Sequence, residues 1–236
     1  METGPSGWVS AAPPIGEQVT VLMVHYRTPD LLRVAVESFY GQCPDLPMLV
    51  FDNGSFGSPE GEASRTLFEE LESRFAPLLR IERHPRNLFH GPALDLALRE
   101  RIDTPYAFIL DSDTRTLRPG FLPAMVERLE ADERHYAIGV AEQVNERGFK
   151  QAGGMRILLT PYLLLRTALY PRFAPIVHHG QPTLFHFRDA QRQGYALLDF
   201  PIESYIEHEW RGTASRFGYR LGWRGRIDYL LNRMGL

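Results

Sequence analysis

Short apolar runs alternate with amphipathic helical segments in the first half of the chain, and this alternation limits the fold most. The runs are rich in branched and aromatic side chains, which favour buried strands. Strands that alternate with helices at this spacing predict βαβ units and a largely parallel sheet. We therefore expect an α/β fold, one domain whose mostly parallel central sheet is flanked by helices. The expected strands are 19–24, 47–51, 78–81 and 106–110, and the expected helices between them are 31–39, 59–74 and 92–101.

The alternation weakens beyond residue 120. A helix is expected at 121–129 and another near 183–193, with extended segments at 136–141, 156–165 and 195–200. No repeat or linker divides residues 18–236, which indicates one domain. Residues 1–17 are rich in Gly, Pro, Ser and Ala and carry no secretory signal pattern, so we expect a mobile N-terminal tail.

Composition excludes several classes of protein. The net charge of −3 argues against bulk binding of nucleic acid, which needs a cationic surface. The lone Cys43 cannot form an internal disulfide, so a reducing compartment and a cytoplasmic location are expected. No run of about 18 apolar residues predicts a membrane-spanning helix.

The C-terminal segment 211–236 is basic, with six arginines against the single acid Asp228, and aromatic residues lie between them. Such a segment can rest on an anionic membrane, which would place the protein peripherally at the inner face. The simpler interpretation, which we favour, is a C-terminal helix packed on its own core with its arginines in solvent.

Asp111-Ser112-Asp113 follows the apolar run 106–110 directly. Ligands of open α/β sheets bind beyond the carboxyl ends of the strands, and a two-residue period sends both aspartates to one side of the chain. Their oxygens suit Mg²⁺ or Mn²⁺, which would in turn hold a diphosphate. The alternative is a polar turn that ends the strand and caps the next helix.

Further polar residues follow the other expected strands. Right-handed crossovers would bring the loops at 25–30, 52–57 and 111–114 to one edge of the sheet. There Tyr26 could stack on a flat ring, and Asp52 could accept hydrogen bonds from a nucleobase or from ribose. Neither a dinucleotide glycine fingerprint nor a phosphate loop is present, so a diphosphate would be held through a metal.

Across residues 19–130, four stretches resemble successive blocks of the GT-A glycosyltransferases of family 2. They are VTVLMVHYRTPDLLRVAVESF, MLVFDNGS, RHPRNLFHGPALDLAL and YAFILDSDT. The resemblance implies a single Rossmann-like GT-A domain at 18–236, with a nucleotide-sugar half at 18–130 and an acceptor half at 131–236. It also implies an enzyme that uses Mg²⁺ or Mn²⁺ to move a sugar from a nucleoside-diphosphate donor to a hydroxyl of a saccharide or glycolipid acceptor.

The resemblance also implies roles for matching residues. His25 and Tyr26 would line the nucleoside, Asp52 would contact the base, and Asn87 would lie near the sugar-diphosphate. Asp111 would lie beside the ribose and the metal, and Asp113 would bind the metal directly. The expected donor-binding set is His25, Tyr26, Asp52, Asn87, Asp111, Ser112 and Asp113.

The stretch GYALLDFP and the following YIEH resemble the closing block of the family, in which a histidine often reaches the metal. His208 is therefore the expected third metal ligand, with Asp111 and Asp113. The alternatives are a surface histidine or a core histidine with a backbone partner.

The catalytic base departs from the family pattern. Inverting members commonly carry a Glu-Asp pair about a dozen residues before the Gly-Tyr, but this chain has Pro182-Thr183 there. We expect His179 or Asp189 to take this role, because an inverting transferase needs a base within reach of the acceptor hydroxyl. The missing pair keeps a second interpretation open, a nucleotide- or sugar-binding module without catalysis. A nucleotidyltransferase is a further alternative, although its usual glycine-rich signature is absent. Asp95 stands where the family often has Asn and is assigned no role.

Overall fold

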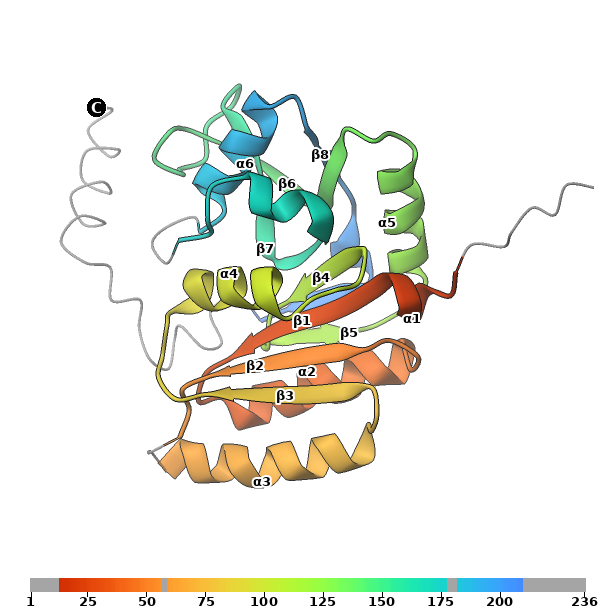
Figure 1. Cartoon of the computed structure of the whole chain (residues 1–236), viewed down its shortest axis with the longest axis vertical. Coiled ribbons are helices and arrows are strands. Elements are labelled where there is room, and N and C mark those ends of the chain that lie inside the picture. The colour runs from red at the N-terminus through yellow and green to blue at the C-terminus, as the bar shows by residue number, and fades with distance from the viewer. Residues whose placement is uncertain (1–12, 57–58, 178–181, 210–236) are drawn as a thin grey trace, which may run out of the picture.

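The central element of the fold is a seven-stranded sheet with the order β3-β2-β1-β4-β7-β6-β8 (Figure 1). The computed structural model describes residues 13–56, 59–177 and 182–209. Neighbouring strands run parallel except where β7 pairs antiparallel with β4 and with β6. The expected α/β fold with a mostly parallel sheet is confirmed. The strands are β1 (Val19–His25), β2 (Met48–Asn53), β3 (Leu79–His84), β4 (Tyr106–Leu110), β6 (His135–Val144), β7 (Met155–Arg166) and β8 (Ala196–Asp199).

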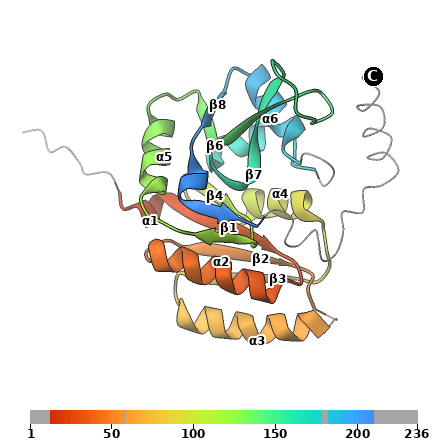
Figure 2. The same cartoon turned by 180° about the vertical axis from the view of Figure 1, so that it is seen from behind.

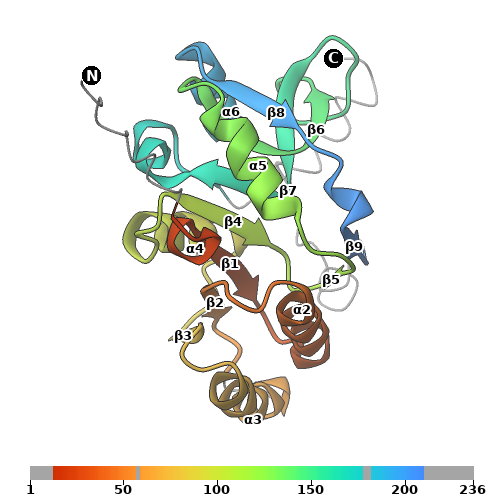
Figure 3. The same cartoon turned by 90° about the vertical axis from the view of Figure 1, so that its right-hand side faces the viewer.

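Helices cover both faces of this sheet. On one face lie α4 (His90–Glu100), the 3-10 helix η1 (Thr167–Arg172) and α6 (Leu184–Arg192). The other face is covered by α2 (Pro29–Gln42), α3 (Pro59–Arg74) and α5 (Phe121–Glu130), as Figure 2 shows. Figure 3 places α4 and α2 on opposite sides of β1. Two apolar clusters, one on each face, therefore form the core.

The residues of β4 illustrate why this chain forms such a sheet. Tyr106, Phe108 and Leu110 belong to one cluster, and Ala107 and Ile109 belong to the other. All of them are buried, so the strand is apolar on both faces. A strand covered on both sides reads as a continuous apolar run, which is the signal that predicted it.

A small second sheet was not expected from the sequence. It pairs β5 (Thr114–Thr116) antiparallel with β9 (Ile206–His208), and the short 3-10 helix η2 (Ile202–Ser204) precedes β9. The pairing joins two segments that lie far apart in the sequence, with Thr114 opposite His208. It brings the C-terminal end of the described chain beside the turn that follows β4.

The expected N-terminal tail and the basic C-terminal segment lie largely outside the described residues. Residues 1–12 of the expected tail lie outside the described residues, but the short helix α1 (Ile15–Gln18) falls within its last part. The basic segment 211–236 lies outside the described residues as well. In the part of the chain that is described, no helix is long and apolar enough to cross a membrane.

Candidate metal centre

The carboxyl ends of β1, β2 and β4 meet at one edge of the sheet, because these strands are parallel neighbours. His25, the last residue of β1, lies opposite Asp52 of β2 in the strand register. Asp111 follows the last residue of β4, and its amide donates a hydrogen bond to the Pro161 carbonyl of β7. Polar side chains from different parts of the sequence therefore meet where the parallel strands end.

Asp111, Asp113 and His208 form a cluster at this edge. One ligand atom from each residue can be chosen so that the three lie within 4.8 Å of one another. His208 Nε2 is 3.0 Å from Asp113 Oδ1 and 3.8 Å from Asp111 Oδ2. The β5–β9 pairing produces this proximity, because it sets His208 opposite Thr114, the residue after Asp113. The three expected metal ligands are thus brought together.

The two carboxylates and the imidazole of the cluster are largely shielded from solvent. The exposed fraction of the side chain is 22% for Asp111, 9% for Asp113 and 5% for His208. Burial raises the pKa of Asp111, and the neighbouring Asp113 carboxylate adds to this effect. Burial alone would lower the pKa of His208, but the hydrogen bond and the charges of Asp113 and Asp111 raise it overall. The two carboxylates therefore attract positive charge to this position.

A divalent cation fits this set of donors. Asp111 Oδ1 is buried and has no hydrogen-bond partner among the described residues, so protein donors do not satisfy this carboxylate fully. Two carboxylates suit Mg²⁺ or Mn²⁺, and the imidazole suits a transition metal. An octahedral ion held by these three side chains would take its remaining ligands from a second molecule or from water.

Two of the expected donor-binding residues are fully buried in a polar network. The Thr28 amide donates to His25 Nε2 over 3.1 Å, so Nδ1 carries the proton and donates to Asp52 Oδ1 over 3.0 Å. Asp52 also accepts hydrogen bonds from the amide and the hydroxyl of Ser55. His25, Asp52 and Ser55 have no exposed surface, so they lock the loops after β1 and β2 together. Direct contact of His25 and Asp52 with a donor stays a prediction.

Two hydrogen bonds of the Asn53 side chain connect the loop between β3 and α4 to the end of β2. Asn53 Oδ1 accepts a hydrogen bond from the Leu88 amide over 2.8 Å, and Asn53 Nδ2 donates to Asn87 Oδ1 over 3.1 Å. Gly54 has a φ of 80° and packs directly against the backbone of Arg86 and Asn87. Asn87 itself is exposed, and its expected role near a diphosphate stays a prediction.

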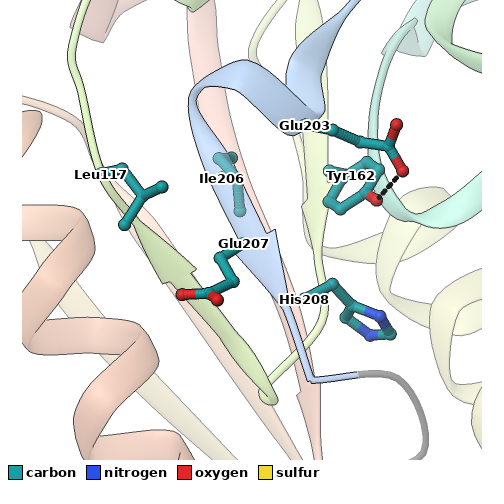
Figure 4. Close-up of a pocket in the computed structure, with 6 residues that line it drawn as sticks. All are labelled: Leu117, Tyr162, Glu203, Ile206, Glu207 and His208. Carbon is teal, nitrogen blue, oxygen red and sulfur yellow. Dashed lines mark hydrogen bonds between the residues drawn. The ribbon is translucent and has the colours of Figure 1, made fainter.

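An open pocket of about 340 Å³ adjoins His208 (Figure 4). The Tyr162 hydroxyl donates to Glu203 over 3.2 Å, and the Tyr162 ring lies edge-on to the His208 ring with centroids 6.1 Å apart. Neither Tyr162 nor Glu203 was singled out from the sequence. Tyr162 lies within an apolar strand pattern, and no local signal sets it apart from core residues. The pocket is lined by Leu117, Tyr162, Glu203, Ile206, Glu207 and His208.

Comparisons with known proteins identify the family of this chain. The model of glycosyl transferase family 2 matches residues 20–192, which is more than half of the chain. The chain belongs to glycosyl transferase family 2. No curated protein matches its sequence.

Solved structures with the same fold include several transferases. A mannosyltransferase from Pyrobaculum calidifontis in complex with GDP-Man and Mn²⁺ is 16% identical with a TM-score of 0.60, over 81% of this chain and 57% of that one. GalNAc-T7 with UDP, GalNAc and Mn²⁺ is 14% identical with a TM-score of 0.64, over 81% and 43%. Glucosyl-3-phosphoglycerate synthase from Mycobacterium tuberculosis, with Mn²⁺, UDP and glucosyl-3-phosphoglycerate, is 16% identical with a TM-score of 0.57, over 98% and 87%. At these identities the similarity shows the fold alone, and the chain spans less than two thirds of the first two proteins.

Of the two expected catalytic bases of this family 2 chain, Asp189 falls within the described residues. His179 lies outside the described residues. Asp189, on α6, is half-buried, and its Oδ2 accepts a hydrogen bond from the Ala174 amide over 3.0 Å. It thereby fixes the segment at Ala174, near the end of the described range 59–177. A role for either residue as base stays a prediction.

Asp95, which the sequence left without a role, fixes the same segment from α4. It accepts hydrogen bonds from the Tyr170 hydroxyl over 2.6 Å, from the Ile176 amide over 3.3 Å and from Arg99 Nε. A carboxylate here can accept from three donors at once. The negative charge of Asp95 also pairs with Arg99 over 3.0 Å, which the neutral amide of the Asn common in the family would not do.

His186, on α6, is a buried neutral side chain that contacts the same segment at Ala174. The Tyr136 hydroxyl donates to its Nε2 over 2.6 Å, so Nδ1 carries the proton and donates to the Ala174 carbonyl over 2.6 Å. Burial lowers the pKa of His186 to about 4. The side chain has no exposed surface, which makes its protonation in the folded state costly.

The lowered pKa of His186 predicts that the free energy of unfolding depends on pH. Between about pH 6.5 and pH 4 the unfolded chain binds a proton at His186 that the folded chain does not, so stability falls as the pH falls through this window. At one pKa unit per 1.36 kcal/mol, the loss is up to about 3 kcal/mol. Urea unfolding at a series of pH values should give a shallower decline for His186→Gln than for the wild type. Parallel profiles for the two proteins would contradict this assignment.

Proposed function

We propose that this protein is a metal-dependent glycosyltransferase that moves a sugar from a nucleoside-diphosphate donor to a hydroxyl acceptor. The observation that carries the proposal is the Asp111–Asp113–His208 cluster at the edge where β1, β2 and β4 end. Membership of family 2 and the nucleotide and Mn²⁺ complexes among structural neighbours support it.

Different side chains of this protein would bind the metal, bind the donor and position the loops in such a reaction. Asp113 and His208 would hold Mg²⁺ or Mn²⁺, with Asp111 beside them. A bound divalent ion would neutralise the charge that grows on the leaving diphosphate. Tyr26 and Asn87 would contact the nucleoside and the sugar-diphosphate, while His25 and Asp52 keep their loops in place. The pocket beside Tyr162, Glu203 and Glu207 offers hydroxyl-binding groups for the sugar or the acceptor.

The transfer itself requires a proton acceptor if the enzyme inverts. The acceptor oxygen would form a bond to the anomeric carbon while the bond from that carbon to the diphosphate oxygen breaks. The acceptor proton would pass to His179 or Asp189. A saccharide or glycolipid acceptor, a cytoplasmic location and a peripheral membrane contact through 211–236 remain our expectations from the sequence.

Calorimetry with uridine, guanosine and thymidine diphosphates in the presence of Mn²⁺ tests the binding part of the proposal. We expect tight binding of a nucleoside diphosphate that EDTA abolishes. A separate assay should then detect slow hydrolysis of the nucleotide-sugar with the matching base. Absence of binding for every nucleotide would contradict the proposal. Binding without turnover on any donor and acceptor would instead favour the noncatalytic module, which the missing Glu-Asp pair suggests.

A further inference from the structure

His90 lies beside the metal cluster but belongs to neither the expected ligands nor the expected donor-binding residues. It is the first residue of α4, and its Nε2 lies 3.6 Å from Asp111 Oδ1. Both of these atoms are buried and have no hydrogen-bond partner among the described residues. The other carboxylate oxygen, Asp111 Oδ2, faces His208 at 3.8 Å. Asp111 is thus bracketed by two imidazoles, one on each oxygen.

The backbone before His90 is held in a conformation that determines where α4 begins. Phe89 has a φ of 68° and a ψ of 165°, a region that is otherwise almost restricted to glycine. Its amide donates to Asn87 Oδ1 over 2.7 Å, and the Asn53 side chain forms hydrogen bonds with Asn87 and Leu88. Such strain persists only where surrounding contacts impose it, and it is concentrated at functional sites. Here it sets the ring of His90 against Asp111.

We propose that His90 is a positioning residue of the metal centre, which donates from Nε2 to Asp111 Oδ1 and so orients Oδ2 toward the ion. This inference rests on the proposed function. The present separation exceeds a hydrogen bond by a few tenths of an ångström, which a small rotation of a half-exposed imidazole covers. Carboxylates that bind metals are themselves held by hydrogen bonds, and loss of such a partner typically weakens metal affinity about 10–100-fold.

The inference explains why a buried donor and a buried acceptor face each other. A hydrogen bond between them would satisfy both atoms, whereas an unpaired buried polar atom is destabilising. It would also hold Asp111 in one rotamer, so that the ion would not have to order the carboxylate when it binds. His90 would therefore act on metal affinity through Asp111, without contacting the ion.

Titration with Mn²⁺ alone tests the role of His90 without any turnover. The electron paramagnetic resonance signal of free Mn²⁺ reports how much metal each variant binds. We expect His90→Ala to weaken the Mn²⁺ affinity about 10–100-fold. His90→Gln carries an amide donor at the matching distance from the backbone and should return to within a few-fold of the wild type. The matched control is His135→Ala at the start of β6, where the ring bonds the Arg128 carbonyl; its affinity should be unchanged.

The outcomes separate this inference from the proposed function. Wild-type affinity in His90→Ala overturns the positioning role, and so does a His90→Gln variant as weak as His90→Ala. Asp113→Ala is the reference for loss of the metal centre itself. If it binds Mn²⁺ as tightly as the wild type, the cluster is not the metal site, and the proposed function fails together with this inference. Circular dichroism of each variant verifies that it is folded.

Discussion

Asp113→Ala is expected to abolish metal-dependent binding of nucleoside diphosphates. Asp113 is nearly buried and lies 3.0 Å from His208 Nε2, at the centre of the cluster. Without its carboxylate, the cluster keeps Asp111 Oδ2 and His208 Nε2, which lie 3.8 Å apart, and loses one of its two negative charges. We expect Mn²⁺ affinity to fall by more than about 100-fold, beyond the effect of losing an outer partner.

Calorimetry measures this loss in the presence and absence of Mn²⁺. Asp103→Ala is a suitable control, because Asp103 is an exposed aspartate in the loop before β4. The control should bind metal and nucleotide like the wild type. The Asp113 variant should stay folded, since its loss relieves repulsion of the Asp111 carboxylate, whose pKa Asp113 helps to raise. Unchanged metal dependence in Asp113→Ala would refute its role as a ligand.

Gly54→Ala is expected to give the largest loss of stability. A Cβ at this position would lie 2.4 Å from the carbonyl carbon of Arg86 and 2.5 Å from the amide nitrogen of Asn87. Backbone cannot move aside as a flexible side chain can. Left-handed backbone adds roughly 1–2 kcal/mol for a non-glycine residue, and overpacking adds roughly 1–3 kcal/mol. We therefore expect a loss of about 2–5 kcal/mol.

Gly153→Ala separates the two causes of this loss. Gly153 has a φ of 74°, close to that of Gly54, but a Cβ there would meet nothing within 4 Å. It should lose only the conformational part, roughly 1–2 kcal/mol, in urea unfolding. Equal losses in the two variants would show that the β2 loop does not pack tightly against residues 86–87. Gly54→Ala should also weaken Mn²⁺ binding, because this packing places His90.

The sequence predicted the main sheet well because its strands bury both faces. Residues 106–110 were predicted with the bounds of β4, since a doubly covered strand is apolar throughout. The strands β1, β2 and β3 extend further than expected, into polar residues such as His25 and Asn53. These residues pair in the register of the sheet, which a hydrophobicity pattern does not record.

The second sheet was missed for a different reason. Its strands have three residues each, and Thr114 to Thr116 carries no apolar pattern. The pairing partner lies far away in the sequence, so no local signal joins the two segments. The expectation of His208 as a ligand came from resemblance to the family, and the β5–β9 register is the physical reason for its position.

Polar residues at the strand ends show the limit of sequence reasoning about the site. His25 and Asp52 could be placed at one edge of the sheet, but their sequence does not tell whether they face a ligand or each other. The structure makes them partners over 3.0 Å. For Asp189, helical spacing gave the face of the helix but not its partner, the Ala174 amide. His90 was missed because a lone histidine carries no periodic signal.

Diffraction at the Mn absorption edge, from a crystal soaked with Mn²⁺ and a nucleoside diphosphate, would locate the ion itself. We expect one strong anomalous peak within about 2.0–2.4 Å of ligand atoms of Asp113 and His208, with diphosphate oxygens on its open side. An anomalous peak elsewhere, with the nucleotide bound away from the ends of β1, β2 and β4, would contradict this expectation.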